Sequence, residues 1–126
     1  MNTENDLSYL IRGAIFKVYA TLGPGLLESV YVAALSYELK SNGLEVKTEV
    51  PIPVHYEDIK LEVGFRMDIL VDNKVIIEVK SVENLAEVHH KQVITYLKLS
   101  HLKLGILVNF NVENINSGIF RKVNGL

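Results

Sequence analysis

Apolar residues recur at every third or fourth position in three stretches of the chain, which is the spacing of an amphipathic helix. The stretches predict helices over residues 7–20, 26–41 and 84–100. Gly23-Pro24-Gly25 separates the first two, because two glycines around a proline end a helix and allow a sharp turn. We expect the second helix to bury Leu27, Val30, Tyr31, Ala34 and Leu35, and the third to bury a stripe of Leu85, Val88, Gln92, Val93 and Tyr96.

The remaining apolar stretches predict β-strands. Apolar and polar residues alternate between residues 46 and 54, and Pro51 and Pro53 place this strand at a sheet edge because proline cannot donate to a ladder. Residues 62–71 and 75–80 predict a hairpin closed by Asp72-Asn73-Lys74. Residues 103–110 predict a further strand, and residues 119–123 a short last one. This order of helices and strands favours a mixed α/β sandwich.

The register of the hairpin decides which side chains face each other, since residues two apart on a strand share a face. A three-residue loop over 72–74 would give one side of the hairpin only apolar pairs: Val71 with Val75, Ile69 with Ile77, and Met67 with Val79. The other side would set Asp68 opposite Glu78 and Arg66 opposite Lys80. A two-residue loop would mix charged and apolar partners on both sides. Lys74 suits the left-handed position of a three-residue loop poorly, so a longer loop of the same parity stays open.

Two facing carboxylates repel each other, and at half-buried depth the repulsion destabilises the sheet unless something compensates it. A divalent cation compensates, because Mg²⁺ binds one or two carboxylates and fills its other positions with water and phosphate oxygens. Lys80, two residues beyond Glu78, could polarise an attacking water or stabilise charge on a phosphate. The spacing alone is equally compatible with a cross-strand salt-bridge lattice of Asp68, Glu78, Arg66 and Lys80 on a solvated face.

The predicted helices add further polar candidates. Glu28 lies near the start of the second helix, where the helix dipole alone favours a carboxylate. Gln92 and Tyr96 are four residues apart on the third helix, so both could reach a phosphate or a metal-bound water, or simply bond a strand end. Consecutive residues diverge by about 100° on a helix, so His89 and His90 cannot chelate one ion. We expect both, with the other histidines at positions 55 and 101, to lie on the surface or behind the site.

Composition narrows the chemistry. The 126 residues suit one domain covering residues 1–126, and 48% hydrophobic residues are ordinary for a globular protein. The absence of cysteine excludes disulfides, thiolate metal sites and cysteine nucleophiles, so hard cations bound by oxygen are favoured. A net charge of −2 gives no global reason to bind nucleic acid, although a bound cation with nearby Lys and Arg attracts phosphate locally. No apolar run approaches the ~18 residues of a membrane span and the N-terminus is acidic and polar, so we expect a cytoplasmic protein.

Three motifs in chain order resemble the PD-(D/E)XK nuclease superfamily, especially its RecB-like branch. They are Phe65-Arg66-Met67-Asp68, Ile77-Glu78-Val79-Lys80, and Gln92 with Tyr96 on the next helix. The segment Gly25-Leu26-Leu27-Glu28-Ser29-Val30-Tyr31 is similar to the signature of the small bacterial GxxExxY family. The resemblance covers about residues 7–122, and Met67 stands where the superfamily's name has proline.

The resemblance implies a restriction-endonuclease-like fold, an α+β three-layer sandwich with a central mixed sheet flanked by helices. It implies Mg²⁺ or Mn²⁺ as cofactor and hydrolysis of phosphodiester bonds in nucleic acid, with DNA expected. The residues would take these roles: Glu28, Asp68 and Glu78 as metal ligands, Lys80 as the residue assisting the water, and Gln92, Tyr96 and Arg66 as substrate contacts. So small a core offers little surface for gripping a duplex, which favours ends, flaps or single strands and a homodimer. A catalytically silent module that binds nucleic acid or a protein partner, and a phosphohydrolase of small nucleotides, stay open as alternatives.

Overall fold

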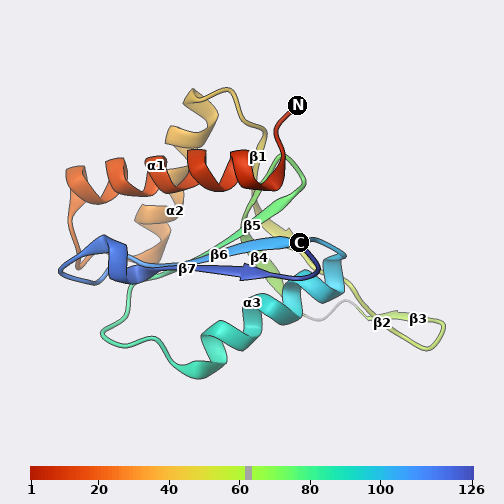
Figure 1. Cartoon of the computed structure of the whole chain (residues 1–126). Helices are drawn as coiled ribbons and strands as arrows, with labels where there is room; N and C mark the ends of the chain where they lie inside the picture. The colour runs from red at the N-terminus through yellow and green to blue at the C-terminus, as the bar shows by residue number, and fades with distance from the viewer. Residues whose placement is uncertain (62–63) are drawn as a thin grey trace.

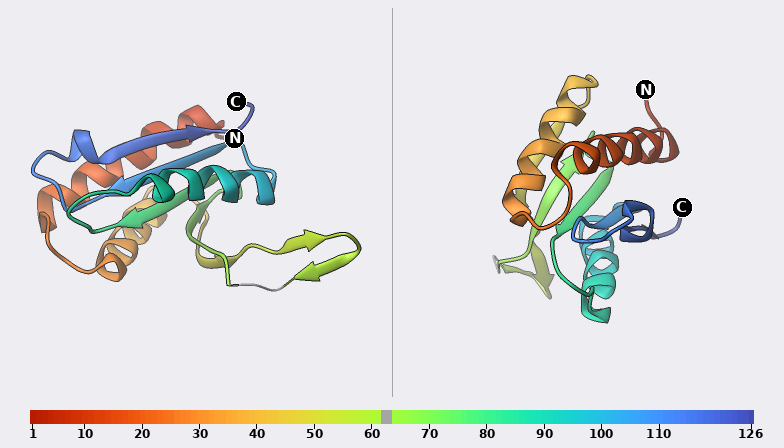
Figure 2. Two further views of the ribbon diagram at one scale, coloured as in Figure 1. Left: turned by 90° about the horizontal axis from the view of Figure 1, so that it is seen from below. Right: turned by 90° about the vertical axis from the view of Figure 1, so that its left-hand side faces the viewer.

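The computed structural model describes residues 1–61 and 64–126 and shows a mixed sheet with helices on both faces. Five strands lie in the order β1-β4-β5-β6-β7, with β5 and β6 parallel and the other neighbours antiparallel. Helices α1 and α2 cover one face and α3 covers the other (Figures 1 and 2). The elements are α1 Glu4–Leu22, α2 Glu28–Ser41, β1 Val46–Pro51, β2 Val54–Tyr56, β3 Ile59–Leu61, β4 Arg66–Val71, β5 Val75–Lys80, α3 Glu87–Ser100, β6 Leu104–Asn109, η1 Ile115–Gly118 and β7 Ile119–Val123. The predicted three-layer sandwich is confirmed.

The first helix begins earlier than its apolar periodicity indicates. The Thr3 side chain accepts a hydrogen bond from the Asp6 N–H, and the Asp6 carboxylate accepts one from the Thr3 N–H. This reciprocal capping satisfies two backbone donors of the first turn, so α1 starts at Glu4 rather than at residue 7.

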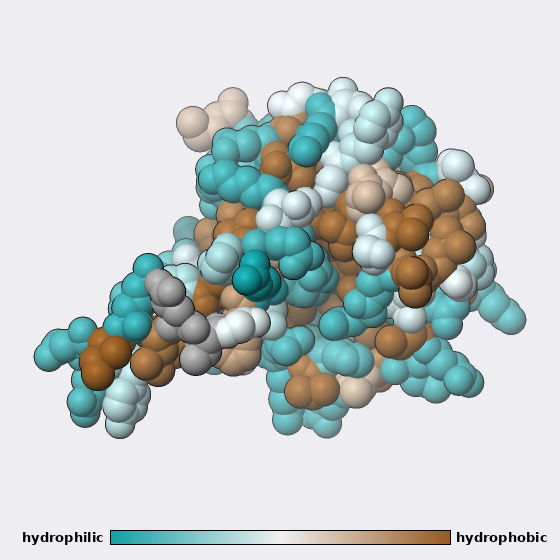
Figure 3. Space-filling view, turned by 180° about the vertical axis from the view of Figure 1, so that it is seen from behind, coloured by the Kyte–Doolittle hydropathy of each residue, from teal (hydrophilic) through white to brown (hydrophobic). Residues whose placement is uncertain are grey.

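The second helix begins at Glu28, and its predicted apolar face is partly wrong. Leu27 and Val30 are exposed, whereas Tyr31, Leu35 and Leu39 are buried against the sheet. The chain reaches α2 through a turn in which Gly23 and Gly25 have φ angles of 68° and 96°, values that suit glycine. Because this turn extends past Gly25, α2 begins at Glu28, two residues later than predicted. Figure 3 shows the molecule from behind, with apolar residues gathered on the right-hand side of the view. The exposed apolar residues in and next to the α1–α2 connection are Leu22, Leu26, Leu27 and Val30.

The predicted strand over residues 46–54 is divided into two. β1 is an edge strand of the main sheet, as the prolines predicted, and it ends at Pro51. β2 begins at Val54 and pairs with β3 in a separate hairpin, which projects from the body of the molecule (Figure 1). The pattern of residues along the chain did not predict this hairpin. The predicted strand over 62–71 begins at positions 62 and 63, which lie outside the described residues, and β4 is described from Arg66.

The β4–β5 hairpin has the predicted register. Val71 pairs with Val75 and Ile69 with Ile77, so the loop contains three residues. Lys74 does not occupy a left-handed position, because the positive φ angles fall on Asp72 and Asn73, two residue types that tolerate them.

The expectation that one side of this hairpin is uniformly apolar is wrong at Met67. Ile69, Val71 and the facing β5 residues pack against α1 and α2, whereas Met67 packs with Ile76 and Tyr96 under α3. The pairing of β4 with the edge strand β1 is irregular at the residue after Met67. Glu49 on β1 has a φ of 53°, and the pairing of β1 with β4 omits Glu49 while continuing on both sides of it. This irregularity interrupts the alternation of faces next to Asp68.

The third helix begins at Glu87 instead of residue 84, and its expected apolar stripe is wrong at Val88, which is exposed. Val93, Tyr96 and Leu97 supply the buried face. Helix α3 lies close to the sheet at Gly105 of β6, where a Cβ would come within 2.6 Å of Val93 Cγ1. The missing side chain at Gly105 therefore allows α3 to pack close to the sheet.

Candidate active site

Asp68 and Glu78 face each other on β4 and β5, and each carboxylate accepts a backbone hydrogen bond from the other strand. The Asp68 N–H donates to Glu78 Oε1 over 3.2 Å, and the Val79 N–H donates to Asp68 Oδ2 over 2.8 Å. The last backbone pair described between these strands is Ile69 with Ile77, so the side-chain contacts continue the association where that pairing ends. The two acids are therefore brought together, as the register predicted.

Glu78 is the more deeply placed of the two acids, with only 4% of its surface exposed. Burial, together with the charge of the neighbouring Asp68, raises the pKa of Glu78 to about 9, and the charge of Lys80 opposes part of this rise. At neutral pH the Glu78 carboxyl therefore holds a proton when no cation is bound. A cation bound between Asp68 and Glu78 would add positive charge to that of Lys80 and would allow both acids to ionise.

Glu28 reaches the same region from the first turn of α2. Its Oε2 accepts a hydrogen bond from the Ser81 N–H over 3.2 Å, directly beyond the end of β5. The Ser81 hydroxyl donates to the Leu26 carbonyl over 2.6 Å, so two contacts join the start of α2 to the end of β5. Glu28 and Asp68 line one cavity of about 630 Å³. Glu28 is thus both an N-terminal helix acid and a neighbour of the strand acids.

Tyr31 holds the turn that delivers Glu28. Its hydroxyl donates to the Gly23 carbonyl over 2.5 Å and accepts from the Leu26 N–H over 3.1 Å, so it bridges both ends of the turn. The ring stacks on Phe110 with a centroid separation of 4.3 Å. This buried tyrosine therefore fixes the entry of α2 relative to the sheet.

Lys80 lies half-buried at the end of β5, and its charge acts on Glu78 from the same side of the strand. Among the described residues, no ion pair joins Lys80 or Arg66 to Asp68 or Glu78, so the alternative of a salt-bridge lattice is wrong. Arg66 is exposed, pairs with Pro51 on β1, and lines a separate cavity of about 540 Å³.

Tyr96 and Gln92 approach the strands from α3. Tyr96 is buried, and burial raises its pKa, with further contributions from the charges of Glu78 and Asp68. Its ring lies 5.8 Å from that of Phe65, centroid to centroid. Gln92, one turn earlier, is half-buried. Tyr96 therefore belongs to the surroundings of the two acids, on the face opposite to α2.

The two adjacent histidines have structural contacts. His89 Nδ1 accepts a hydrogen bond from the Ala86 N–H at the start of α3. The His90 ring packs edge-on against Phe120 of β7 with a centroid separation of 4.8 Å. The two rings have separate partners, which agrees with the prediction that they do not bind one ion together.

Comparison with known proteins gives one finding. A family model described as the PD-(D/E)XK nuclease superfamily matches residues 5–122. The chain belongs to the PD-(D/E)XK nuclease superfamily. No curated protein and no solved structure gives a significant match. Membership of this superfamily agrees with the mixed sheet and its flanking helices, and it indicates nuclease activity on a nucleic-acid substrate. No helix within residues 1–61 and 64–126 is long and apolar enough to cross a membrane.

The divalent cations typical of PD-(D/E)XK nucleases fit the oxygen donors of this site. Mg²⁺ commonly takes one or two carboxylates and completes its shell with water and phosphate oxygens. Asp68 and Glu78 offer that pair, and the backbone hydrogen bonds described above use one oxygen of each. In the part of the chain that the structure describes, no group of three or more His, Asp or Glu side chains is arranged to hold a metal ion. Glu28 therefore reaches the cavity without completing a three-acid cluster.

Two polar residues that hold the site in place, Ser81 and Asn109, were not predicted from the sequence. Ser81 anchors Glu28, and the signal was its position directly after Glu78-x-Lys80. Asn109, which is buried on β6 beside Lys80, bonds Val82 through both its amide oxygen and its amide nitrogen. It thereby holds the chain as it leaves β5. A lone Asn at the end of an apolar strand gave no signal of this role.

Proposed function

We propose that this chain is a divalent-metal-dependent nuclease that hydrolyses phosphodiester bonds of nucleic acid, with DNA as the expected substrate. The observation that supports it most is the facing pair of Asp68 and Glu78, one of them buried, beside Lys80. A purely structural role does not explain a buried acid at this position, because burial and the facing Asp68 penalise the ionised form of Glu78 unless a cation compensates the charge. Gly25, Glu28 and Tyr31 together support assignment to the GxxExxY family within the superfamily.

Asp68 and Glu78 would hold Mg²⁺ or Mn²⁺, and Glu28 would be the third protein ligand, since it shares a cavity with Asp68. A cation bound there supplies an acidified water and neutralises charge on the phosphate. The Asp68 and Val79 N–H groups hold the two strand carboxylates in place, so the ligands are oriented before a substrate arrives.

Lys80 is the residue we assign to the attacking water. Its side chain leaves β5 on the same side as Glu78, and its ammonium group can orient a water or stabilise the charge of the phosphate in the transition state. Tyr96 and Gln92 on α3 would support Lys80 or contact the substrate, and Arg66 would contact the substrate further along β4. A cytoplasmic location and a homodimer remain predictions.

The deciding experiment is a cleavage assay with Mn²⁺ or Mg²⁺ on labelled single-stranded, duplex and flapped DNA, with matched RNA strands. Wild-type protein should cleave at least one of these. Lys80→Ala should lose at least about a hundredfold in rate, the scale of removing one preorganised charge-stabilising group. Lys98→Ala, at an exposed position of α3, is the matched control and should retain activity. Cleavage that Lys80→Ala leaves unchanged would contradict the proposal, and binding without cleavage would favour a catalytically silent module.

A further inference from the structure

A groove runs along α2 from the acids of the candidate active site to the C-terminal end of the helix. It has a volume of about 630 Å³ and separates one side of α2 from the edge of the sheet. Glu28 and Asp68 lie at one end, and Lys40 lies in the last turn of the helix at the other. Lys40 is twelve residues after Glu28, about 18 Å along the helix axis. The remaining lining residues are Ser29, Val32, Ala33, Ser36, Tyr37, Thr48 and Glu49.

Ser36 leaves an unused hydrogen-bonding group in this groove. Its side chain is buried, with 6% of the residue exposed, and its hydroxyl has no hydrogen-bond partner within residues 1–61 and 64–126. A buried hydroxyl without a partner destabilises a protein, because its hydrogen bonds to water have been lost without replacement. Since Ser36 lines the groove, a ligand bound there can accept the hydrogen bond that the protein leaves unmade.

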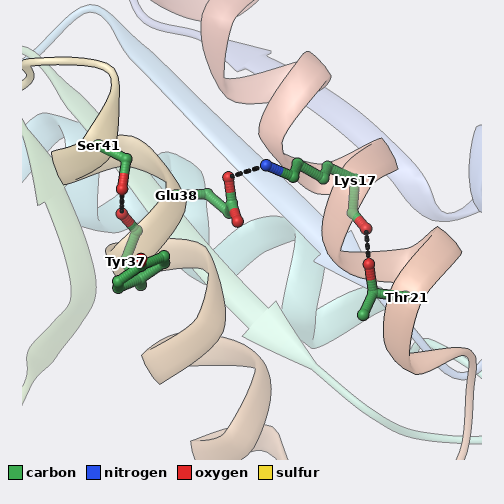
Figure 4. Close-up of polar contacts among 5 residues, drawn as sticks. All are labelled: Lys17, Thr21, Tyr37, Glu38 and Ser41. Atoms are coloured by element: carbon green, nitrogen blue, oxygen red, sulfur yellow. Dashed lines mark hydrogen bonds and ion pairs between the residues drawn. The ribbon is translucent and has the colours of Figure 1, made fainter.

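Tyr37 and Lys40 supply two further kinds of contact on the same wall. Tyr37 is 70% exposed, and Figure 4 shows its ring directed away from α1, while the next residue, Glu38, reaches toward α1 and pairs with Lys17. Lys40 is exposed one turn later. An exposed aromatic ring, a hydroxyl and a cation in one groove are the groups that bind a single nucleic-acid strand, through stacking on a base and contacts to the backbone.

The two ends of the groove differ in charge. Glu28, Glu49 and Asp68 make the active-site end acidic, so a phosphate is attracted there only through a cation. Lys40 makes the far end basic. An exposed ring stacks most readily on a base that has left its partner strand, which favours a single strand over a duplex in this groove.

We propose that this groove binds a single-stranded segment of nucleic acid next to the bond that is cut, with Tyr37 stacking on a base and Ser36 and Lys40 contacting the backbone. At roughly 3.4 Å per stacked nucleotide, 18 Å accommodates about five nucleotides. This inference rests on the proposed nuclease function and specifies its substrate as single strands or single-stranded ends.

The test measures binding of a fluorescent single-stranded oligonucleotide by anisotropy, with Mg²⁺ present and in the Lys80→Ala background so that the strand is not consumed. Tyr37→Ala should weaken binding about tenfold, whereas Tyr37→Phe keeps the ring and should bind within about twofold of the parent. Lys40→Ala should make the fall of log K with log salt concentration less steep, reducing the magnitude of the slope by about 0.7.

Lys98→Ala and Ser41→Ala are the controls, and neither should change binding. Ser41 is the matched serine, because its hydroxyl already donates to the Tyr37 carbonyl (Figure 4) and is not left without a partner.

Ser36→Ala provides a readout that a purely structural role would not produce. The change removes an unpartnered buried hydroxyl, so it should raise the melting temperature of the free protein, and it should at the same time weaken binding of the strand several-fold. A raised melting temperature with unchanged binding contradicts a ligand contact at Ser36. Parental binding by Tyr37→Ala and Lys40→Ala, or tighter binding of duplex than of single strand, overturns the inference.

The two proposals can fail separately. If Tyr37→Ala cleaves as fast as the wild type at low and at high strand concentration, the nuclease function is supported and a role of the groove in it is contradicted. Loss of binding in the groove variants, in a protein that cleaves nothing, would support the groove and contradict the nuclease.

Discussion

At the scale of single residues, Glu78 determines how the protein responds to pH. Burial raises its pKa to about 9, whereas an unfolded chain has a carboxyl near the ordinary value of 4.5. The native state therefore holds one more proton than the unfolded state between these values. Its contribution to stability is complete below about pH 4.5 and is lost as the pH rises toward 9. Metal-free protein should consequently lose stability across this range.

Thermal melts in EDTA from pH 5 to pH 9 test this assignment. The melting temperature of the wild type should fall with pH, and that of Glu78→Gln, which cannot ionise, should fall less. Glu83→Gln, at an exposed position, should behave as the wild type. Parallel curves for wild type and Glu78→Gln would show that another group is responsible.

Tyr31 is a second residue whose contacts predict a specific loss. Tyr31→Phe removes the hydroxyl that bridges Gly23 and Leu26, and should lower the free energy of unfolding by about 1–2 kcal/mol. Because the same turn delivers Glu28, cleavage should fall by on the order of tenfold or more. Tyr19→Phe is the matched control: its hydroxyl bonds the Val112 carbonyl and neither end of the turn, so stability should fall with little effect on cleavage measured well below the melting temperature.

At the scale of elements, the close contact of α3 with β6 supports the placement of Tyr96. Gly105→Ala would put a Cβ within 2.6 Å of Val93 Cγ1, and a β-branched side chain has little freedom to yield. Overpacking of this kind should destabilise the protein by about 1–3 kcal/mol and move α3 away from the strands. Gly13→Ala on α1 meets nothing within 4 Å and should stabilise by about 0.5–1 kcal/mol. Urea denaturation of both variants measures the contrast, and equal effects would show that α3 is free to shift.

Elements with strong periodicity were predictable from the sequence, and their irregular ends were not. The register of the β4–β5 hairpin followed from matching apolar faces, and β7 was predicted with its observed bounds. The separate β2–β3 hairpin was missed because the alternation of apolar residues continues past Pro51 and hides the break between two strands. The switch of Met67 to the α3 side occurs beside the left-handed backbone of Glu49 on the neighbouring strand, and glutamate is a residue type that gives no such signal in a sequence.

The candidate site shows the same division. Asp68, Glu78 and Lys80 could be located because strand periodicity places them on one side of a hairpin. The link from Glu28 to Ser81 depends on how two distant segments, 53 residues apart, meet in space, so local patterns could not reveal it. The unpartnered hydroxyl of Ser36 has the same origin, since Ser36 occupies a buried helical position that the sequence pattern assigns to neither core nor site.

At the scale of the whole molecule, the candidate site lies between two hydrophobic clusters. One cluster joins α1 and α2 to the sheet and the other joins α3 to the opposite face. Glu28 comes from the first side and Tyr96 from the second, while Asp68 and Glu78 lie on the strands between them. A cation bound by Glu28, Asp68 and Glu78 would join α2 to the two central strands, so its binding should be visible in global stability.

Titration with Mg²⁺ or Mn²⁺ tests this link. At a metal concentration 100 times the dissociation constant, a site present only in the folded state stabilises by about 2.7 kcal/mol, which raises the melting temperature by several degrees. Because Glu78 is protonated in the metal-free protein and must ionise to bind, the shift should grow as the pH rises from 6 toward 9, and calorimetry in buffers of different ionisation enthalpy should detect release of up to one proton. Asp68→Ala should abolish the shift, whereas Asp58→Ala, on the projecting β2–β3 hairpin, should retain it. A metal-induced shift that is equal in all three proteins, or that is independent of pH, would mean that the cation binds somewhere other than between Asp68 and Glu78.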